Sequence, residues 1–204
     1  LVTPLRPIPN GIARVVTSKP ASTIPLNGKE LIQRSSASTV TVFARQRKGV
    51  GVIISESGLI VTALAAVEGL PSVVVKGADN KRASGRVVAI DPDTKTALVQ
   101  VQPIPNAGVP FRLSADTLGE RVTVCGPSVT NGANRSIRQG FVTSTPPGEL
   151  DTNVSVDESF LGAPIFDSYG RLLGLVTGYE APPSYSAKGV PIRTIFSSLN
   201  VNVP

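Results

Sequence analysis

The sequence predicts an all-β protein, from its composition, its short strand-like segments and the turn signals between them. Aromatic residues make up 4% of the 204 residues, so the core must consist mainly of Val, Ile, Leu and Ala. The branched side chains of Val, Ile and Thr favour strands because they fit a pleated surface. Frequent turns without intervening helices favour sandwiches or barrels over a parallel sheet.

The N-terminal part of the chain differs from the rest. Residues 1–28 contain five prolines without clear periodicity, which predicts an extended arm or linker. The segment NGKELIQRSSA, residues 27–37, predicts one short helix with Asn27 as a candidate cap. Because the chain starts at Leu, we expect an excised domain or a mature form, with any upstream anchor outside it. The main domain is expected over residues 29–204.

From Thr39 onward, strand-like segments follow one another at short intervals. They are TVTVFA, GVGVIIS, GLIVTALAAV, SVVVKG, GRVVAID, TALVQVQ, RVTVCG, IRQGFVTST, LDTNVSV, GAPIFDS and RLLGLVTGY. Turn signals such as SESG, GADN, DPDT, PPGE and DSYG separate them. Two six-stranded halves would fit this pattern, joined near residues 103–110. Only the closing segment PIRTIFSSLN predicts a helix.

Charge and composition narrow the classes of partner and cofactor. The net charge is +6, but Lys and Arg are scattered, and the only tight run is RQRK at residues 45–48. This run is typical of a solvated hairpin tip, and contact with an acidic lipid or an acidic partner is the alternative. Aromatic residues for stacking are sparse, so no nucleic acid is expected. With no His and one Cys, a catalytic zinc centre is close to excluded, and no cofactor is expected.

Two acidic pairs could attract a hard cation. These are Asp91 with Asp93 and Asp157 with Glu158. Neither pair has the spacing of a calcium loop, and Asp91 followed by proline is typical of a turn. We therefore predict no metal site, and a metal-binding domain on this scaffold remains a disfavoured alternative.

Four segments in order resemble the protease domain of the HtrA (Deg) family of trypsin-like serine proteases. They are GVGVIISESGLIVTALAAVEG, GRVVAIDPDTKTALVQV, LDTNVSVDESFLGAPIFDSYGRLLGLVTG and KGVPIRTIFSSL. The resemblance runs from about Glu30 to Leu199. It implies a trypsin-like fold of two six-stranded β-barrels with a short C-terminal helix.

The resemblance also implies where the catalytic triad of the family would lie. Its histidine position falls on Ala65, its aspartate position on Lys95 and its serine position on Leu161. A serine protease needs a base, a carboxylate that orients the base, and a nucleophile. None of these three side chains can fill its role. We therefore expect a pseudoprotease that is not an enzyme.

The family's oxyanion loop corresponds to Ser159, Phe160 and Leu161, followed by Gly162 and Ala163. Oxyanion stabilisation uses backbone N–H groups, so side-chain identity alone does not remove it. Ser159 replaces a glycine and restricts the backbone. Phe160 and Leu161 add bulk, which either fills the cleft from the inside or forms an exposed apolar interaction site.

A rebuilt hydrolase is the main alternative. Ser159 lies two positions from the lost serine, and Lys95 could act as its base in a Ser-Lys arrangement. Cys125 could act as a thiolate, but no histidine is present to lower its pKa, so a small core residue is the simpler interpretation.

Peptide binding does not need the triad. Members of the family bind extended polypeptide by strand addition beside the cleft. The corresponding edge here is Thr177, Gly178 and Tyr179. We expect a binding, scaffold or regulatory module for a protein or an extended peptide, with an active protease relative as one possible partner. The resemblance further implies an extracytoplasmic location, in a bacterial periplasm or facing it from a membrane tether outside this sequence.

Overall fold

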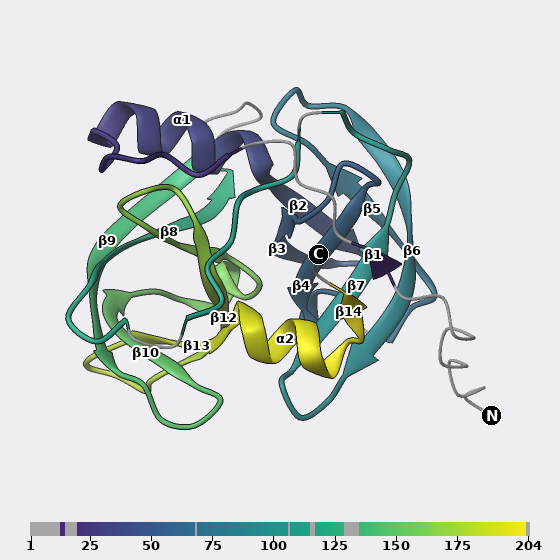
Figure 1. Cartoon of the computed structure of the whole chain (residues 1–204). Helices are drawn as coiled ribbons and strands as arrows, with labels where there is room; N and C mark the ends of the chain where they lie inside the picture. Colours follow the sequence, from purple (N-terminus) through teal and green to yellow (C-terminus); the bar gives the residue numbers. More distant parts are fainter. Residues whose placement is uncertain are drawn as a thin grey trace.

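The structure is a computed structural model of the whole chain, and it consists of two β-barrels side by side (Figure 1). It describes residues 13–14, 20–67, 69–105, 107–114, 117–128 and 135–202. Each barrel is closed and has six strands, so the predicted all-β double barrel is confirmed. Most of the arm predicted over residues 1–28 lies outside the described residues.

The first barrel contains the strands from Thr39 to Gln100, all paired antiparallel, in the order β2-β3-β4-β7-β6-β5. A short 3₁₀ turn, η1 (Leu64–Ala66), follows β4. The strands are β2 (Thr39–Ala44), β3 (Arg47–Ile53), β4 (Leu59–Ala63), β5 (Ser72–Lys76), β6 (Arg82–Asp91) and β7 (Thr96–Gln100).

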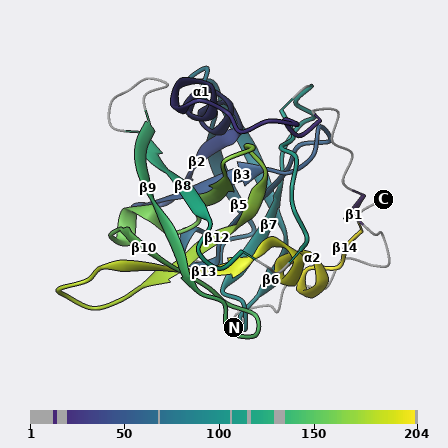
Figure 2. The ribbon, with the colours of Figure 1, turned by 60° about the vertical axis from the view of Figure 1, so that its left-hand side comes forward.

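The second barrel follows the connection through residues 101–120 and has the order β10-β13-β12-β11-β8-β9, again antiparallel. The 3₁₀ turn η2 (Glu158–Phe160) lies between its third and fourth strands. The hairpin of β12 and β13 projects from the body of the molecule (Figure 2). The strands are β8 (Arg121–Ser128), β9 (Arg135–Ser144), β10 (Leu150–Ser155), β11 (Pro164–Asp167), β12 (Leu172–Tyr179) and β13 (Ser186–Pro191).

Both predicted helices are present. Helix α1 (Gly28–Ser38) begins with a capping box, in which the Asn27 side chain accepts from Glu30 N–H and the Glu30 carboxylate accepts from Asn27 N–H. Helix α2 (Ile192–Ser198) packs Ile195 and Phe196 into the core, and the Phe196 ring meets Phe111 edge-on. No helix in the described ranges is long and apolar enough to span a membrane.

Strands β1 (Ala13–Arg14) and β14 (Val201–Asn202) form a separate parallel pair beside the first barrel.

The barrels are filled by aliphatic side chains, as the composition predicts. In the first barrel, Val40, Val42, Val73 and Val75 point inward from β2 and β5 and are buried. Alternate positions of the same strands, such as Val74, face outward. Burying one such side chain contributes about 1.5–3 kcal/mol. The core therefore depends on the alternating pattern that the sequence shows.

The two barrels are joined by backbone contacts between β3 and the residues that follow η2. The Val50 N–H on β3 donates to the Leu161 carbonyl (3.0 Å) across the joint, and on the second-barrel side the Gly162 N–H donates to the Val176 carbonyl of β12 (2.8 Å). Gly162 has φ +85°, and a Cβ there would meet the Val50 carbonyl oxygen. The joint thus requires glycine at position 162, both for its backbone angle and for the lack of space.

We predict that Gly162→Ala lowers the free energy of unfolding more than Gly148→Ala does. Both glycines have positive φ, +85° and +79°, but nothing lies within 4 Å of a Cβ at Gly148. The backbone angle costs about 1–2 kcal/mol at either site, and the collision at Gly162 adds about 1–3 kcal/mol. Denaturant unfolding of both variants measures the difference. Equal losses would contradict the tight joint.

Candidate functional site

A cavity of about 380 Å³ opens between the two barrels. Strand β3 and turn η1 form its wall on the first barrel, and turn η2 with Leu161 forms the wall on the second. Its lining residues are Arg47, Lys48, Gly49, Ala65, Ala66, Glu158, Ser159 and Leu161. Two of the predicted triad positions, Ala65 and Leu161, therefore meet in one cleft with Ser159.

Turn η1 is held against β3 by close packing. A Cβ at Gly49 would collide with the Cβ of Ala66, so glycine lets the turn approach the strand. The Leu64 N–H donates to the Lys95 carbonyl (2.8 Å), which ties η1 to the turn between β6 and β7. The position of Ala65 in the cleft follows from these two contacts.

Lys95 itself points elsewhere. Its side chain is exposed in the β6–β7 turn and is not among the residues that line the cleft. It contributes its backbone carbonyl to η1, with φ +54°. The Ser-Lys arrangement considered from the sequence therefore gains no support from the geometry. The assignment of Lys95 to the aspartate position stays a prediction.

Asp157 orders the η2 turn from its N-terminal end. Its carboxylate accepts from the Ser159 N–H (2.8 Å) and from the Ser159 hydroxyl (2.5 Å). This is an ordinary N-cap, in which the side-chain oxygen satisfies one of the free N–H groups at the start of the turn. It also places a carboxylate against the hydroxyl of the only serine that lines the cleft.

The two bulky residues of this loop have different roles. Phe160 is 2% exposed, its ring lies against Gly126, and the guanidinium of Arg138 lies 5.7 Å from the ring centre. Leu161 is half-buried and lines the cavity. Phe160 therefore fills the interior of the second barrel, while Leu161 supplies apolar surface to the cleft. From the sequence, Phe160 and Leu161 could each either fill the cleft from the inside or form an exposed apolar interaction site.

Cys125 is fully buried in β8 and lies outside the cleft. Burial raises the pKa of its thiol, which outweighs the opposing effects of Thr39, Arg135 and residues of α1. Such a thiol is a poor nucleophile at neutral pH because little of it is ionised. The arrangement matches a small core residue.

The predicted peptide edge lies at the end of β12. Before this edge, Val176 exchanges hydrogen bonds with Gly162 and Ala163, so its polar groups face η2. The Glu180 N–H donates to the Ser186 carbonyl on β13 (2.9 Å). Successive residues alternate in direction, so the N–H and C=O of Tyr179 face away from β13. On that side, no strand in the described residues pairs with positions 177–179.

The sequence did not indicate that Arg47 and Lys48 belong to the cleft. Both are exposed at the start of β3, and both line the cavity. Of their run, RQRK, only Arg45 and Gln46 form the turn of the predicted hairpin tip, whereas Arg47 and Lys48 belong to β3. Strand β3 packs against η2, and this packing brings Arg47 and Lys48 to the cleft. Their position there is visible only in the three-dimensional structure.

We predict that Phe160→Ala destabilises the fold strongly and that Leu161→Ala does not. Removing a buried aromatic ring costs about 3–5 kcal/mol, whereas Leu161 is half-buried. Thermal unfolding of the two variants measures this. Similar losses at both positions would contradict the assignment of Leu161 to the cavity wall.

A pH effect is expected at the turn that supports η1. The Asp91 carboxylate is partly buried, which raises its pKa, but hydrogen bonds from Thr94, Ser198 and the Asp93 N–H outweigh this, and its pKa lies below the ordinary 3.8. A lowered pKa stabilises the fold above the unfolded-state value, and this stability is lost as pH falls through the folded-state value.

We therefore predict that Asp91→Asn is less stable than the wild type at pH 7 and that the difference shrinks below pH 3.8. Thermal midpoints measured from pH 7 to pH 3 test this. A difference that stays constant over the whole range would show that ionised Asp91 contributes nothing to the turn.

Comparison with known proteins identifies relatives that match most of the chain. The family described as Trypsin-like peptidase domain matches residues 49–175. Protease Do-like 1 of Arabidopsis thaliana is 26% identical over 182 residues, 81% of this chain and 42% of that protein. A probable periplasmic serine endoprotease DegP-like of Pseudomonas putida is 28% identical over 142 residues, 64% of this chain and 29% of that protein.

An uncharacterized protein of Sinorhizobium fredii is 30% identical over 143 residues, 66% of this chain and 22% of that protein. The serine endoprotease of Yersinia pestis superposes with a TM-score of 0.77 and 20% identity, covering 85% of this chain and 65% of that structure. The chain thus spans less than half the length of these curated relatives. The resemblance to HtrA-type proteases is confirmed.

The same comparisons contradict one expectation from the sequence, that the chain is not an enzyme. The relatives in Arabidopsis, Pseudomonas and Synechocystis are named as proteases, and the matching structure is a serine endoprotease. The expectation depended on three aligned side chains. An alignment at this level of identity does not establish which residues act in the cleft. Ser159, considered from the sequence as a replacement nucleophile, lies in the cleft, and its contact with Asp157 was not predicted.

Proposed function

Since this chain belongs to the trypsin-like peptidase domain family, we propose that its cleft binds an extended segment of polypeptide. The segment adds to the edge of β12 at Thr177, Gly178 and Tyr179, and one of its side chains enters the cavity beside Leu161 and Ser159. The observation that carries this proposal is the edge of β12 at Tyr179, which no strand of the described residues pairs with, on the side where Val176 bonds to Gly162 and Ala163. Backbone pairing of this kind gives affinity, and the neighbouring cavity gives selectivity.

A second function, peptide hydrolysis at Ser159, is favoured by one contact. The Ser159 hydroxyl lies in the cleft and donates to the Asp157 carboxylate at 2.5 Å. The chain has no His, and the base in contact with the hydroxyl is the Asp157 carboxylate. It would take the hydroxyl proton as the oxygen attacks the peptide carbonyl carbon and pass it to the amine that leaves as the C–N bond breaks; water would then hydrolyse the acyl-serine in the same way. A carboxylate is a weaker base than imidazole near pH 7, so we expect slow turnover.

The proposed location is extracytoplasmic. Its support is that relatives in Pseudomonas and Halomonas are named as periplasmic endoproteases. The proposed partner is a protein with an exposed extended segment, and an active protease relative is one candidate. The β12 edge supports this class of partner because main-chain pairing needs an unfolded or extended stretch.

The experiment incubates the domain with a diverse peptide pool and follows retention and cleavage by mass spectrometry. We predict that Tyr179→Pro weakens retention by tenfold or more, because proline removes the N–H of the edge. Tyr185→Asn is the matched control. It changes a similarly exposed tyrosine of the same hairpin, and asparagine tolerates its φ of +52°. Equal retention by wild type and Tyr179→Pro would contradict edge binding.

The cleavage arm tests the second function. We predict that any cleavage products disappear in Ser159→Ala and diminish in Asp157→Asn, because the first removes the nucleophile and the second its only carboxylate partner in the turn. Cleavage that survives Ser159→Ala would place the chemistry on another residue. Retention without cleavage would limit the domain to binding under these conditions.

A further inference from the structure

Basic side chains gather on the outer face of the first barrel, on neighbouring strands. Phe43 on β2 pairs with Lys48 on β3 and with Val74 on β5, and Lys76 pairs with Arg82 on β6. Residues that pair directly in an antiparallel sheet present their side chains on the same face. We call this group the basic patch. It consists of Phe43, Lys48, Val74, Lys76, Arg82 and Arg86.

An aromatic ring organises the centre of the basic patch. The Lys48 ammonium lies 5.9 Å and the Arg82 guanidinium 5.5 Å from the centre of the Phe43 ring. Cation–π attraction at these distances holds both cations above the ring. Val74 beside it is 39% exposed. The basic patch therefore presents fixed positive charges around a small apolar surface.

Within the described part of the chain, no acidic side chain balances these charges. None of the four basic side chains has an ion-pair partner within the ranges that the structure describes. Asp79, in the adjacent turn, pairs instead with Lys81 at 3.4 Å. Asp91, the one acidic residue of β2, β3, β5 and β6, accepts hydrogen bonds within its own turn. The excess positive charge is available to an anionic partner.

The basic patch is continuous with the cleft through Lys48. This residue lines the cavity beside Leu161 and Ser159, and its ammonium also lies over Phe43. A chain that leaves the cleft across the β2–β3 hairpin therefore reaches the basic patch directly. The outward face of β5 there carries Ser72, Val74 and Lys76, and this length of strand matches about four or five residues of an extended chain.

We propose that the basic patch binds an acidic segment of the partner polypeptide, adjacent in the partner's sequence to the residues that occupy the cleft. Its carboxylates pair with Lys76, Arg82 and Arg86, and an apolar side chain packs against Phe43 and Val74. The link to the cleft rests on the proposed function, whereas the affinity of the basic patch for an acidic segment does not. Charge complementarity of this kind sets partner choice and speeds association.

Two other anionic partners fit the basic patch less well. A lipid surface is engaged by apolar groups that insert into it, but Phe43 is half-buried and lies under two cations. Single-stranded nucleic acid stacks its bases on several aromatic rings, and the basic patch has only one, with its face occupied. An acidic peptide needs neither insertion nor stacking.

The test measures fluorescence anisotropy of a labelled eight-residue peptide that alternates Glu and Leu. A matched peptide carries Gln in place of each Glu. We expect the acidic peptide to bind at least tenfold more tightly than the Gln peptide and to weaken as salt rises, because exposed charges are screened. Combining Arg82→Gln with Arg86→Gln should reduce its affinity by at least tenfold.

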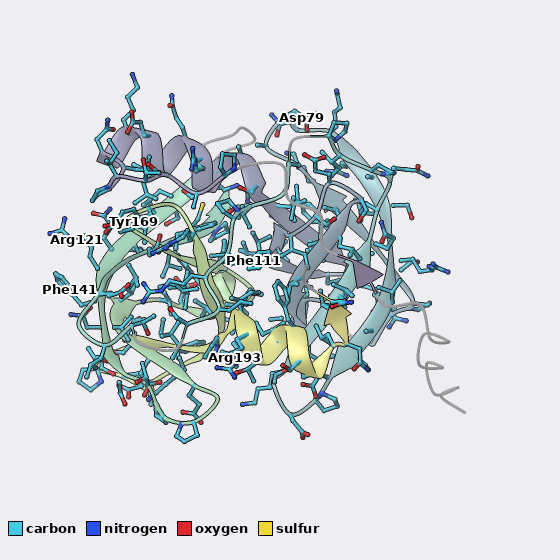
Figure 3. All side chains as sticks on the ribbon, in the orientation of Figure 1. Asp79, Phe111, Arg121, Phe141, Tyr169 and Arg193 are labelled. Carbon is cyan, nitrogen blue, oxygen red and sulfur yellow. The ribbon has the colours of Figure 1, made fainter. Side chains whose placement is uncertain are left out.

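The control variant is Arg121→Gln, and it is compared with Arg82→Gln alone, so that each variant removes one positive charge. Arg121 lies 5.8 Å from the ring centre of Phe141, so the same type of contact is changed on the other barrel. Both residues lie on the outer side of the second barrel, away from the turn of Asp79 on the first (Figure 3). We expect Arg121→Gln to bind the acidic peptide as the wild type does. An equal loss in Arg121→Gln would overturn the proposal, because net charge alone would then explain the binding.

Further outcomes separate this proposal from the proposed function. Equal binding of the Glu and Gln peptides overturns the basic patch as an acidic-segment site, even if the cleft retains other peptides. Tighter binding of phosphatidylglycerol vesicles or of a single-stranded oligonucleotide also overturns it and assigns the surface to that class. Acidic-peptide binding that is unchanged in Tyr179→Pro supports the basic patch, whatever the retention experiment shows for the β12 edge.

Discussion

The contact on which the cleft depends is the backbone joint between the barrels. The Val50 N–H reaches the Leu161 carbonyl, and Gly162 allows the approach because it has no Cβ. This joint places η2 against β3, so it brings together the two walls of the cleft, which are built by separate barrels. A hydrogen bond between main-chain groups does not depend on which side chains line the cavity. The framework of the cleft can therefore persist while its chemistry changes.

The strands and helices could be predicted from the sequence because side-chain alternation and helix capping depend on residues that are close together in the chain. Alternation in TVTVFA predicts an inward and an outward face, and the structure buries Val40 and Val42 inside the first barrel. The first helix was predicted from Asn27, and the reciprocal bonds with Glu30 show why it begins there. Such signals act over a few residues, and each strand or helix end carries its own.

The composition of the site was harder to predict from the sequence, since the cleft is assembled from segments about a hundred residues apart. Nothing near Phe160 or Leu161 in the sequence tells which one enters the core, because the answer lies in Gly126 on a distant strand. The place of Arg47 in the cleft likewise depends on barrel closure. The prediction of a non-enzyme was wrong for a related reason: it gave most weight to three aligned positions, whereas the relatives of the whole domain are named as proteases.

The burial of Cys125 has one more consequence. It is the only cysteine of the chain and is fully enclosed between β8, Thr39 and the end of α1. A thiol reagent can reach it only when this part of the structure opens. The rate of its modification therefore reports the local opening free energy of the region where the first helix meets both barrels. The protein thus carries an internal probe of its own dynamics, without any engineered label.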